Sequence, residues 1–207
     1  MPALAEVLEM GSPRAPGPAP TYSPSHVLAV LMTIGDVGSI GRGALAKESG
    51  LGDGAVRTVI RRLGSGGYIV VRPVGCQLTG KGKVAYDELR KRIPKTIELT
   101  KTSLTLGDKQ VALLIRGAGE GVKSGIEQRD ASIKAGAVGA STYVIRGSKF
   151  QVPGSSLDCE ADFPSDAWRK VRRELRPLNG DAIVICGSGE RNTSLIGAIS
   201  AAITLLT

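Results

Sequence analysis

The segment from Gly52 to Gly82 changes its hydrophobic period midway, and this change restricts the possible folds more than any other feature of the sequence. Its first half has apolar residues at spacings of three and four, which predicts a helix with one face in a core. These residues are Val56, Val59, Ile60 and Leu63. A glycine-rich turn at 64–67 follows, and then the runs YIVVRP and CQLT predict a two-stranded ribbon. One small domain must therefore combine a helix with a ribbon.

Three more helices are expected around this segment. The runs SPSHVLAVLMTIGD and GRGALAKESGL predict two helices before it, the first opened by a Ser cap signal and the second closed by Gly50. The run GKGKVAYDELRKRI predicts a helix after the ribbon that stops at Pro94. The lone histidine, His26, lies at the start of the first helix, where we expect a capping or surface role.

The stretches ALAKESGLGDGAVRTVIRRLGSGGYIVV and LTGKGKVAYDEL resemble the winged helix-turn-helix of bacterial and archaeal transcription regulators. The resemblance implies that the helix beginning near Gly52 enters the major groove of double-stranded DNA, while the ribbon and flanking turns contact the backbone. Arg57 and Arg61 would reach guanine edges, and Thr58 a thymine methyl group. The expected DNA-binding residues are Gly54, Arg57, Thr58, Arg61, Arg62, Arg72, Lys81 and Lys83.

The charge distribution agrees with a polyanionic partner. The net charge is +8, and residues 40–95 contain twelve Lys or Arg against four acids, whereas fourteen face twelve from Thr96 onward. Nucleic acid is the commonest polyanion for such a patch. Two alternatives remain at this point: a solvated basic face, or a winged helix that binds a protein partner.

The second half alternates strands with helices, which predicts a small α/β domain. The runs VALLIRGAGEG and DAIVICGSGER each give an apolar strand and a Gly-x-Gly-Glu turn, so we expect duplication or two similar loops side by side. Glycine turns before helices can bind anions, although Val122 breaks the dinucleotide fingerprint. The candidate ligand-binding residues are Gly117, Gly119, Glu120, Gly187, Gly189, Glu190, Arg191, Asn192 and Thr193.

Three interpretations of these loops stay open: a small-molecule or anion sensor, turns without any ligand, and an enzyme or nucleotide-binding site in which Glu120 or Glu190 is the acid or base. The run EQRDASIKAGAVGASTYVIRGSKFQVPG resembles the C-terminal domain of an uncharacterised archaeal family with a winged helix in front. That resemblance implies an architecture and no reaction.

Two helices near the C-terminus have distinctive faces. The run SDAWRKVRRELRP places five basic residues opposite Trp168, Val171 and Leu175, which indicates either a solvated face or a second nucleic-acid surface. The run SLIGAISAAITLL is apolar almost all round, which indicates a central helix or half of a dimer contact.

Together these observations predict an α/β protein, α+β overall, with a flexible arm at 1–23, a winged-helix DNA-binding domain at 24–94 and an α/β ligand-sensing or assembly domain at 95–207. We expect a cytoplasmic, homodimeric transcription regulator that is not an enzyme. No catalytic residue, metal or cofactor is expected, because the three cysteines share no ligand spacing and one histidine cannot form a His-based site. No membrane partner is expected either, since the apolar tail is shorter than the about 20 residues of a spanning helix.

Overall fold

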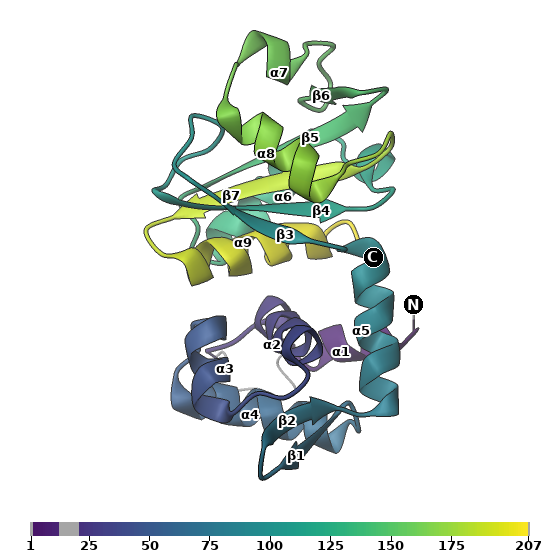
Figure 1. Ribbon diagram of the computed structural model, residues 1–207, viewed down its shortest axis with the longest axis vertical. Helices are drawn as coiled ribbons and strands as arrows, with labels where there is room; N and C mark the ends of the chain where they lie inside the picture. Colours follow the sequence, from purple (N-terminus) through teal and green to yellow (C-terminus); the bar gives the residue numbers. More distant parts are fainter. Residues whose placement is uncertain (1, 13–20, 207) are drawn as a thin grey trace. The chain divides into compact units, whose positions relative to one another are not determined.

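The computed structural model describes residues 2–12 and 21–206. The chain divides into two compact units, Met1–Leu89 and Arg90–Thr207, here unit 1 and unit 2 (Figure 1). Unit 1 combines helices with an antiparallel ribbon, and unit 2 combines helices with an antiparallel sheet. The expected mixed α+β class is therefore confirmed.

Within the described residues, unit 1 follows the order helix, helix, helix, helix, ribbon, helix. Its elements are α1 (Pro2–Glu9), α2 (Pro24–Val37), α3 (Arg42–Ser49), α4 (Asp53–Ser65), β1 (Ile69–Arg72), β2 (Gly75–Leu78) and α5 (Gly80–Arg92), the last of which ends in the first residues of unit 2. Helix α2 is the central element, because most of its side chains are buried. Its first turn is closed by a capping box in which the backbone N–H of Ser23 donates to Nδ1 of His26.

Helix α1 corrects part of the expected flexible arm. Leu4 and Val7 are 1% and 0% exposed, and the helix packs against α2. The apolar side chains of this helix are buried in the core of unit 1. The proline-rich sequence that follows the helix gives no indication of this packing. Residues 13–20 of the expected arm lie outside the described residues.

Unit 2 is a three-layer arrangement around one sheet. The strands are β3 (Thr96–Leu99), β4 (Lys109–Ile115), β5 (Gly139–Arg146), β6 (Lys149–Gln151) and β7 (Ala182–Ser188), in the order β3-β4-β7-β5-β6, and every neighbouring pair is antiparallel. Helices α6 (Ile126–Lys134) and α9 (Arg191–Ile203) cover one face. The short α7 (Cys159–Asp162) and α8 (Asp166–Leu175) cover the other (Figure 1).

The α8 face of the sheet has an aromatic core. The Trp168 ring stacks on Phe150 at a centroid distance of 4.8 Å and meets Tyr143 edge-on at 4.9 Å. The indole Nε1 donates to the carbonyl oxygen of Phe163, so the buried ring has a partner for its one polar atom. These contacts fix α8 on the sheet with its apolar side inward.

Close packing of α5 against the start of the ribbon depends on Gly82. A Cβ atom at this position would lie 1.9 Å from the carbonyl oxygen of Tyr68, so only glycine fits there without a shift of backbone. Thr79 opens the helix, because its hydroxyl accepts from the backbone N–H of Gly82 at 3.0 Å and donates to the carbonyl oxygen of Gly67 at 2.6 Å. The ribbon and α5 are thereby joined into one packed element.

Replacing Gly82 with alanine is expected to lower the free energy of unfolding by about 2–3 kcal/mol, since the new methyl group collides with backbone. The matched control is Gly80→Ala in the same helix, where a Cβ would meet nothing within 4 Å. That control should change stability by less than about 1 kcal/mol. Chemical denaturation of both variants measures the difference, and equal effects would contradict the packing described for Gly82.

Candidate nucleic-acid interface

A three-residue turn holds α4 at a fixed angle to α3. Gly50 ends α3 in a left-handed conformation with φ 69° and ψ 11°, where a side chain would be strained. Leu51 is buried, and Gly52 is extended before the first residue of α4. The backbone conformations of Gly50 and Gly52 and the buried side chain of Leu51 set the geometry of this turn. They fix the start of α4 relative to α3.

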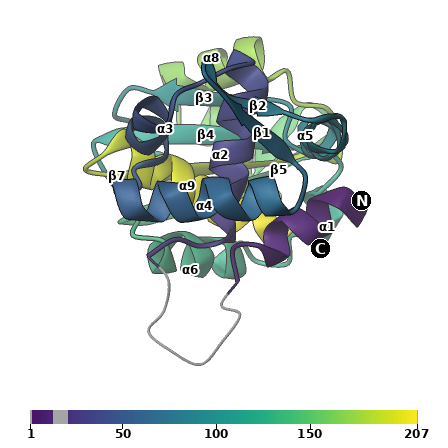
Figure 2. The same cartoon turned by 90° about the horizontal axis from the view of Figure 1, so that it is seen from below.

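The two faces of α4 differ as the spacing predicted. Val56, Val59 and Leu63 are fully buried, whereas Ile60 is half-buried. The expected base-contacting positions Gly54, Arg57 and Arg61 are exposed, and Thr58 is half-buried with its hydroxyl donating to the carbonyl oxygen of Gly54. Figure 2 shows α4 running along unit 1 with the β1–β2 ribbon beside it.

The outer face of α4 is open at its first turn. A Cβ at Gly54 would meet nothing within 4 Å, so another molecule can approach the backbone there. Arg57 and Arg61 are four residues apart and therefore neighbours on the helix surface. Because the hydroxyl of Thr58 is bonded within the helix, its methyl group is the part left for contact.

An ion-pair cluster links α3 to this face. The carboxylate of Asp53 forms an ion pair with Nε of Arg42 at 3.1 Å and accepts a hydrogen bond from Nη2 of Arg57 at 3.0 Å. All three side chains are more than half exposed. Such exposed pairs contribute only about 0.2–1 kcal/mol each, so an anion of higher charge can replace Asp53 as the partner of either arginine.

Three other expected contacts carry unopposed charge. Arg61, Arg72 and Lys83 are exposed, and none of them forms an ion pair within the described part of the chain. Arg72 ends β1 at the tip of the ribbon, beside Val71 and Val74, which are 63% and 70% exposed. The tip itself is anchored, because Cys76 pairs with Ile40 through two backbone hydrogen bonds.

Arg62 and Lys81, also expected to contact DNA, are engaged inside unit 1. Arg62 donates to the carbonyl oxygens of Met10 and Ser12, and its guanidinium lies 5.2 Å from the ring centroid of Tyr22. Lys81 Nζ lies 2.8 Å from the Glu6 carboxylate and 4.4 Å from the ring centroid of Tyr68. Both cations therefore connect the N-terminal segment to the rest of unit 1, a role for which the sequence offers no local signal.

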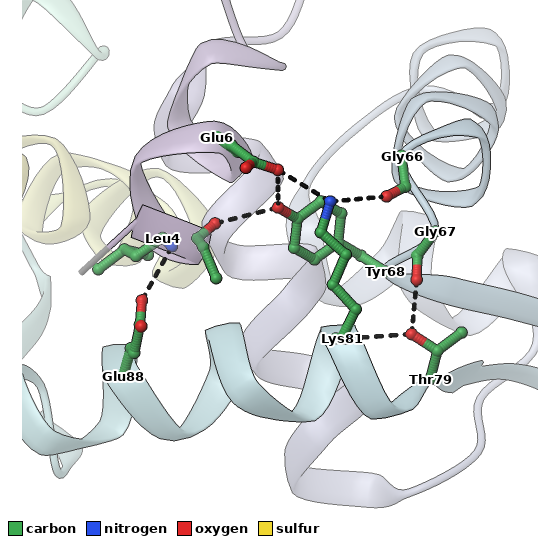
Figure 3. A network of polar contacts seen from close by, with 10 residues as sticks. Leu4, Glu6, Gly66, Gly67, Tyr68, Thr79, Lys81 and Glu88 are labelled. Atoms are coloured by element: carbon green, nitrogen blue, oxygen red, sulfur yellow. Dashed lines mark hydrogen bonds and ion pairs between the residues drawn. The ribbon is translucent and has the colours of Figure 1, made fainter.

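The Glu6 carboxylate is the centre of this second network. Figure 3 shows it between the Tyr68 hydroxyl, which donates at 2.7 Å, and the ammonium group of Lys81, which also donates to the carbonyl oxygen of Gly66. The hydrogen bond from Lys81, followed by that from Tyr68, lowers the pKa of Glu6, and the same bond to Glu6 raises the pKa of Lys81. Burial is the main cause that raises the pKa of Tyr68.

The two Gly-x-Gly-Glu loops lie at opposite ends of the sheet, which corrects the expectation that they are side by side. Strands β4 and β7 are antiparallel, with Lys109 opposite Ser188 and Ile115 opposite Ala182. Each loop follows the C-terminal end of its strand, so the length of a seven-residue strand, about 20 Å, separates them. Within one chain they do not form one shared site.

The first loop is occupied by groups of the protein itself. The buried carboxylate of Asp181 accepts from the guanidinium of Arg116 and from the backbone N–H groups of Gly117 and Leu178. A Cβ at Gly119 would lie 2.9 Å from the carbonyl oxygen of Gly180. Gly119 is therefore explained by packing, and Gly117 by its positive φ of 60°, in a loop where its backbone N–H is bonded to Asp181. Glu120 is exposed.

The second loop is packed at Gly187 and Ser188, whereas Glu190 and Arg191 are exposed. A Cβ at Gly187 would lie 2.1 Å from the carbonyl oxygen of Leu106, and the hydroxyl of Ser188 accepts from the backbone N–H of Glu190. Arg191 pairs with Glu98 and donates to Asn192. The remaining candidates are Gly189, which is exposed with open space around it, and Thr193, which is half-buried.

The described residues contain no group of three or more His, Cys, Asp or Glu side chains placed to hold a metal ion. In that same part of the chain, no helix combines the length and apolar character needed to cross a membrane.

The fold thus defines a mixed α+β protein with an exposed basic helix in unit 1 and a sheet covered on both faces in unit 2. Residues 106–205 match a family described as Domain of unknown function (DUF4443). The hypothetical protein PH0730 from Pyrococcus horikoshii OT3 has a similar structure, with a TM-score of 0.73 and 27% identity over 89% of this chain and 92% of that one. No curated protein matches the chain. The chain is thus similar in structure to an archaeal protein over most of its length.

Replacing Glu6 with glutamine tests the network that its carboxylate forms with Tyr68 and Lys81. Because the pKa of Glu6 in the folded state lies below its ordinary value of 4.5, its ionised form stabilises the protein above that value. This stabilisation is lost as the pH falls through the folded-state pKa. The wild type is therefore expected to melt at a higher temperature than Glu6→Gln at neutral pH, with the difference disappearing well below pH 4.5.

The matched control for this pH series is Glu9→Gln, an exposed position on the same helix with no side-chain bond among the described residues. Melting curves of the three proteins between acid and neutral pH measure the effect. A difference between wild type and Glu6→Gln that persists unchanged in acid would contradict an ionic role for Glu6.

Proposed function

We propose that unit 1 is a winged helix-turn-helix domain that binds double-stranded DNA, as part of a transcription regulator. The observation that carries the proposal is the exposed face of α4, where Arg57 and Arg61 lie one turn apart opposite a fully buried aliphatic face. A helix held in this way can enter the major groove without losing its own packing. The open space at Gly54 supports close approach to the duplex.

The roles of individual residues follow from their chemistry. The guanidinium groups of Arg57 and Arg61 match the O6 and N7 acceptors of guanine, and the methyl group of Thr58 matches that of thymine. Arg72 at the ribbon tip and Lys83 on α5 would contact phosphate, which adds affinity without sequence choice. In this proposal a DNA phosphate displaces Asp53 from Arg42 and a guanine displaces it from Arg57, whereas Arg62 and Lys81 keep their contacts with the N-terminal segment.

In this proposal unit 2 senses a small ligand or mediates assembly of a homodimer. Two-fold symmetry would present two copies of α4 to half-sites about 34 Å apart, one turn of the duplex. The competing interpretation, an enzyme that uses both Gly-x-Gly-Glu loops as one site, is not adopted, since the antiparallel pairing of β4 and β7 keeps these loops apart.

The double substitution Arg57→Ala with Arg61→Ala is expected to weaken binding to the operator by about 30-fold or more, because two arginine–base contacts of about 1–3 kcal/mol each sum to at least about 2 kcal/mol. If the two side chains also neutralise phosphate, the slope of log K against log salt becomes shallower by about 2. The operator can be selected from a random-sequence duplex library, and affinity then measured across salt concentrations.

The matched control removes two exposed charges elsewhere, in Lys123→Ala with Lys134→Ala, and should bind as the wild type does. If Arg57→Ala with Arg61→Ala leaves both the affinity and the salt dependence unchanged, α4 is not the DNA-binding element and the proposal fails.

A further inference from the structure

The helix that follows the first Gly-x-Gly-Glu loop does not begin at that loop. A short 3₁₀ turn at Gly119–Gly121 comes first, and α6 begins at Ile126, directly after the run KSG at 123–125. Gly125 is the N-cap of α6 and has a left-handed backbone conformation, with φ 79° and ψ −5°. A helix N-terminus that follows a glycine turn is a typical position for an anion. In unit 2 this position lies at Gly125 and not at the loop itself.

The first turn of α6 has backbone donors without a partner in the protein. The backbone N–H groups of Glu127 and Gln128 form no hydrogen bond among the described residues, and that of Ile126 has only the Ser124 hydroxyl, at 3.4 Å. The first N–H groups of an α-helix have no partner within the helix and carry the positive end of its dipole. Because Gly125 has no side chain to cap them, these donors are left for an acceptor outside the chain.

A buried hydroxyl without a partner lies against this turn. Thr142 of β5 is 6% exposed, and its Oγ1 forms no hydrogen bond among the described residues. Its side chain is on the α6 face of the sheet, because the next residue, Tyr143, packs against Trp168 on the other face. A Cβ atom at Gly125 would lie 3.3 Å from Cβ and 3.6 Å from Oγ1 of Thr142. The hydroxyl is therefore next to the N-cap of α6.

The neighbours of Thr142 explain why its hydroxyl has no partner within the chain. Val184, opposite it on β7, is apolar, and Pro153, which lies 3.9 Å from the same Cβ position at Gly125, has no backbone N–H. A buried hydroxyl without a partner destabilises a protein relative to an apolar group of the same shape. This hydroxyl and the first-turn N–H groups can all donate, so one ligand with several acceptor oxygens can satisfy them together.

The charges around this position favour a ligand with a single negative charge. Lys123 is exposed and forms no ion pair among the described residues. Glu120 and Glu127 are also exposed, whereas Asp130 is paired with Arg129. With Lys123 set against two exposed acids, a polyphosphate would be repelled, but a small oxyanion can be held chiefly by N–H groups.

We propose that the N-terminus of α6 binds a small oxyanion, a phosphate or a carboxylate. The backbone N–H groups of Glu127 and Gln128, the hydroxyl of Thr142 and the ammonium group of Lys123 would donate to its oxygens. Because Oγ1 of Thr142 is shielded from solvent, binding includes an outward shift of the turn at 123–125. The use of this oxyanion as a signal rests on the function proposed above, whereas the site itself does not.

The test uses the isotope-labelled full chain and nuclear magnetic resonance, with sodium phosphate and sodium acetate as probes against sodium chloride at equal ionic strength. We expect the amide signals of Gly125, Glu127 and Gln128 to shift and to saturate. A response to phosphate alone identifies phosphate as the ligand class, a response to acetate alone identifies a carboxylate, and a response to both indicates a general oxyanion site. If neither probe moves these signals, the proposal is overturned.

Thr142→Val removes the hydroxyl while keeping the shape of the side chain. It should weaken anion binding by about tenfold or more, because a hydrogen bond to a charged group is lost. Its melting temperature without the anion should equal or exceed that of the wild type, since a buried methyl group needs no partner. A hydroxyl that serves only the fold would instead give a lower melting temperature and an unchanged anion affinity, and this result counts against the proposal.

Lys123→Gln and Lys134→Gln form a matched pair near the two ends of α6. Both remove one exposed charge, but only Lys123 lies beside the N-terminus of the helix. Lys123→Gln should weaken binding by about two- to fivefold, and Lys134→Gln should bind as the wild type does. Equal weakening in both variants would show that general positive charge, and not the start of α6, attracts the anion.

Duplex binding separates this inference from the proposed function. We expect the anion to change the affinity of the wild type for its operator and to leave that of Thr142→Val unchanged. Saturable amide shifts in a protein that binds no operator contradict the proposed function and support the site. Operator binding that depends on Arg57 and Arg61, with no amide shift at the start of α6, supports the proposed function and overturns the site.

Discussion

One buried face of α4 determines what unit 1 can present to a partner. Val56, Val59 and Leu63 fill the space between this helix and the rest of the core, which fixes the rotation of α4 about its own axis. Residues on the opposite side, Arg57 and Arg61, must then face solvent. Removing apolar area from water stabilises this orientation far more than an exposed ion pair would. The direction of the charge is therefore a consequence of core packing.

Strand direction has an equally large effect on unit 2. Two similar segments, each an apolar strand followed by a glycine turn, would form adjacent loops in a parallel sheet and distant loops in an antiparallel one. Here β4 and β7 are antiparallel, so the likeness between the two loops does not produce a shared site. Their glycines instead allow neighbouring backbone to approach, at Gly180 for the first loop and at Leu106 for the second.

Features set by local periodicity could be predicted from the sequence, and features set by long-range contacts could not. The aliphatic stripe of α4, the ribbon and the inward side of α8 follow from spacing of three, four or two residues. Glu6 and Lys81 are 75 positions apart, so their ion pair depends on the folded arrangement of unit 1. Sequence patterns also do not specify strand direction. The net charge of each unit depends on where the boundary is drawn, because α5 continues to Arg92 beyond Leu89.

The formal charge of a unit is therefore a poor measure of how many cations can bind a polyanion. Some cations are paired only on the surface, whereas others hold two parts of the fold together. Asp53 pairs with Arg42 and Arg57 on the surface, and exchanging it for phosphate breaks no packing. Lys81 is different: it shares Glu6 with the buried Tyr68, so its release would loosen the contact between α1 and the ribbon. Arg62 is likewise bonded to the carbonyl oxygens that follow α1. The charge available to a ligand in unit 1 is accordingly confined to the outer face of α4, the ribbon tip and Lys83, where binding requires only the exchange of weak surface partners.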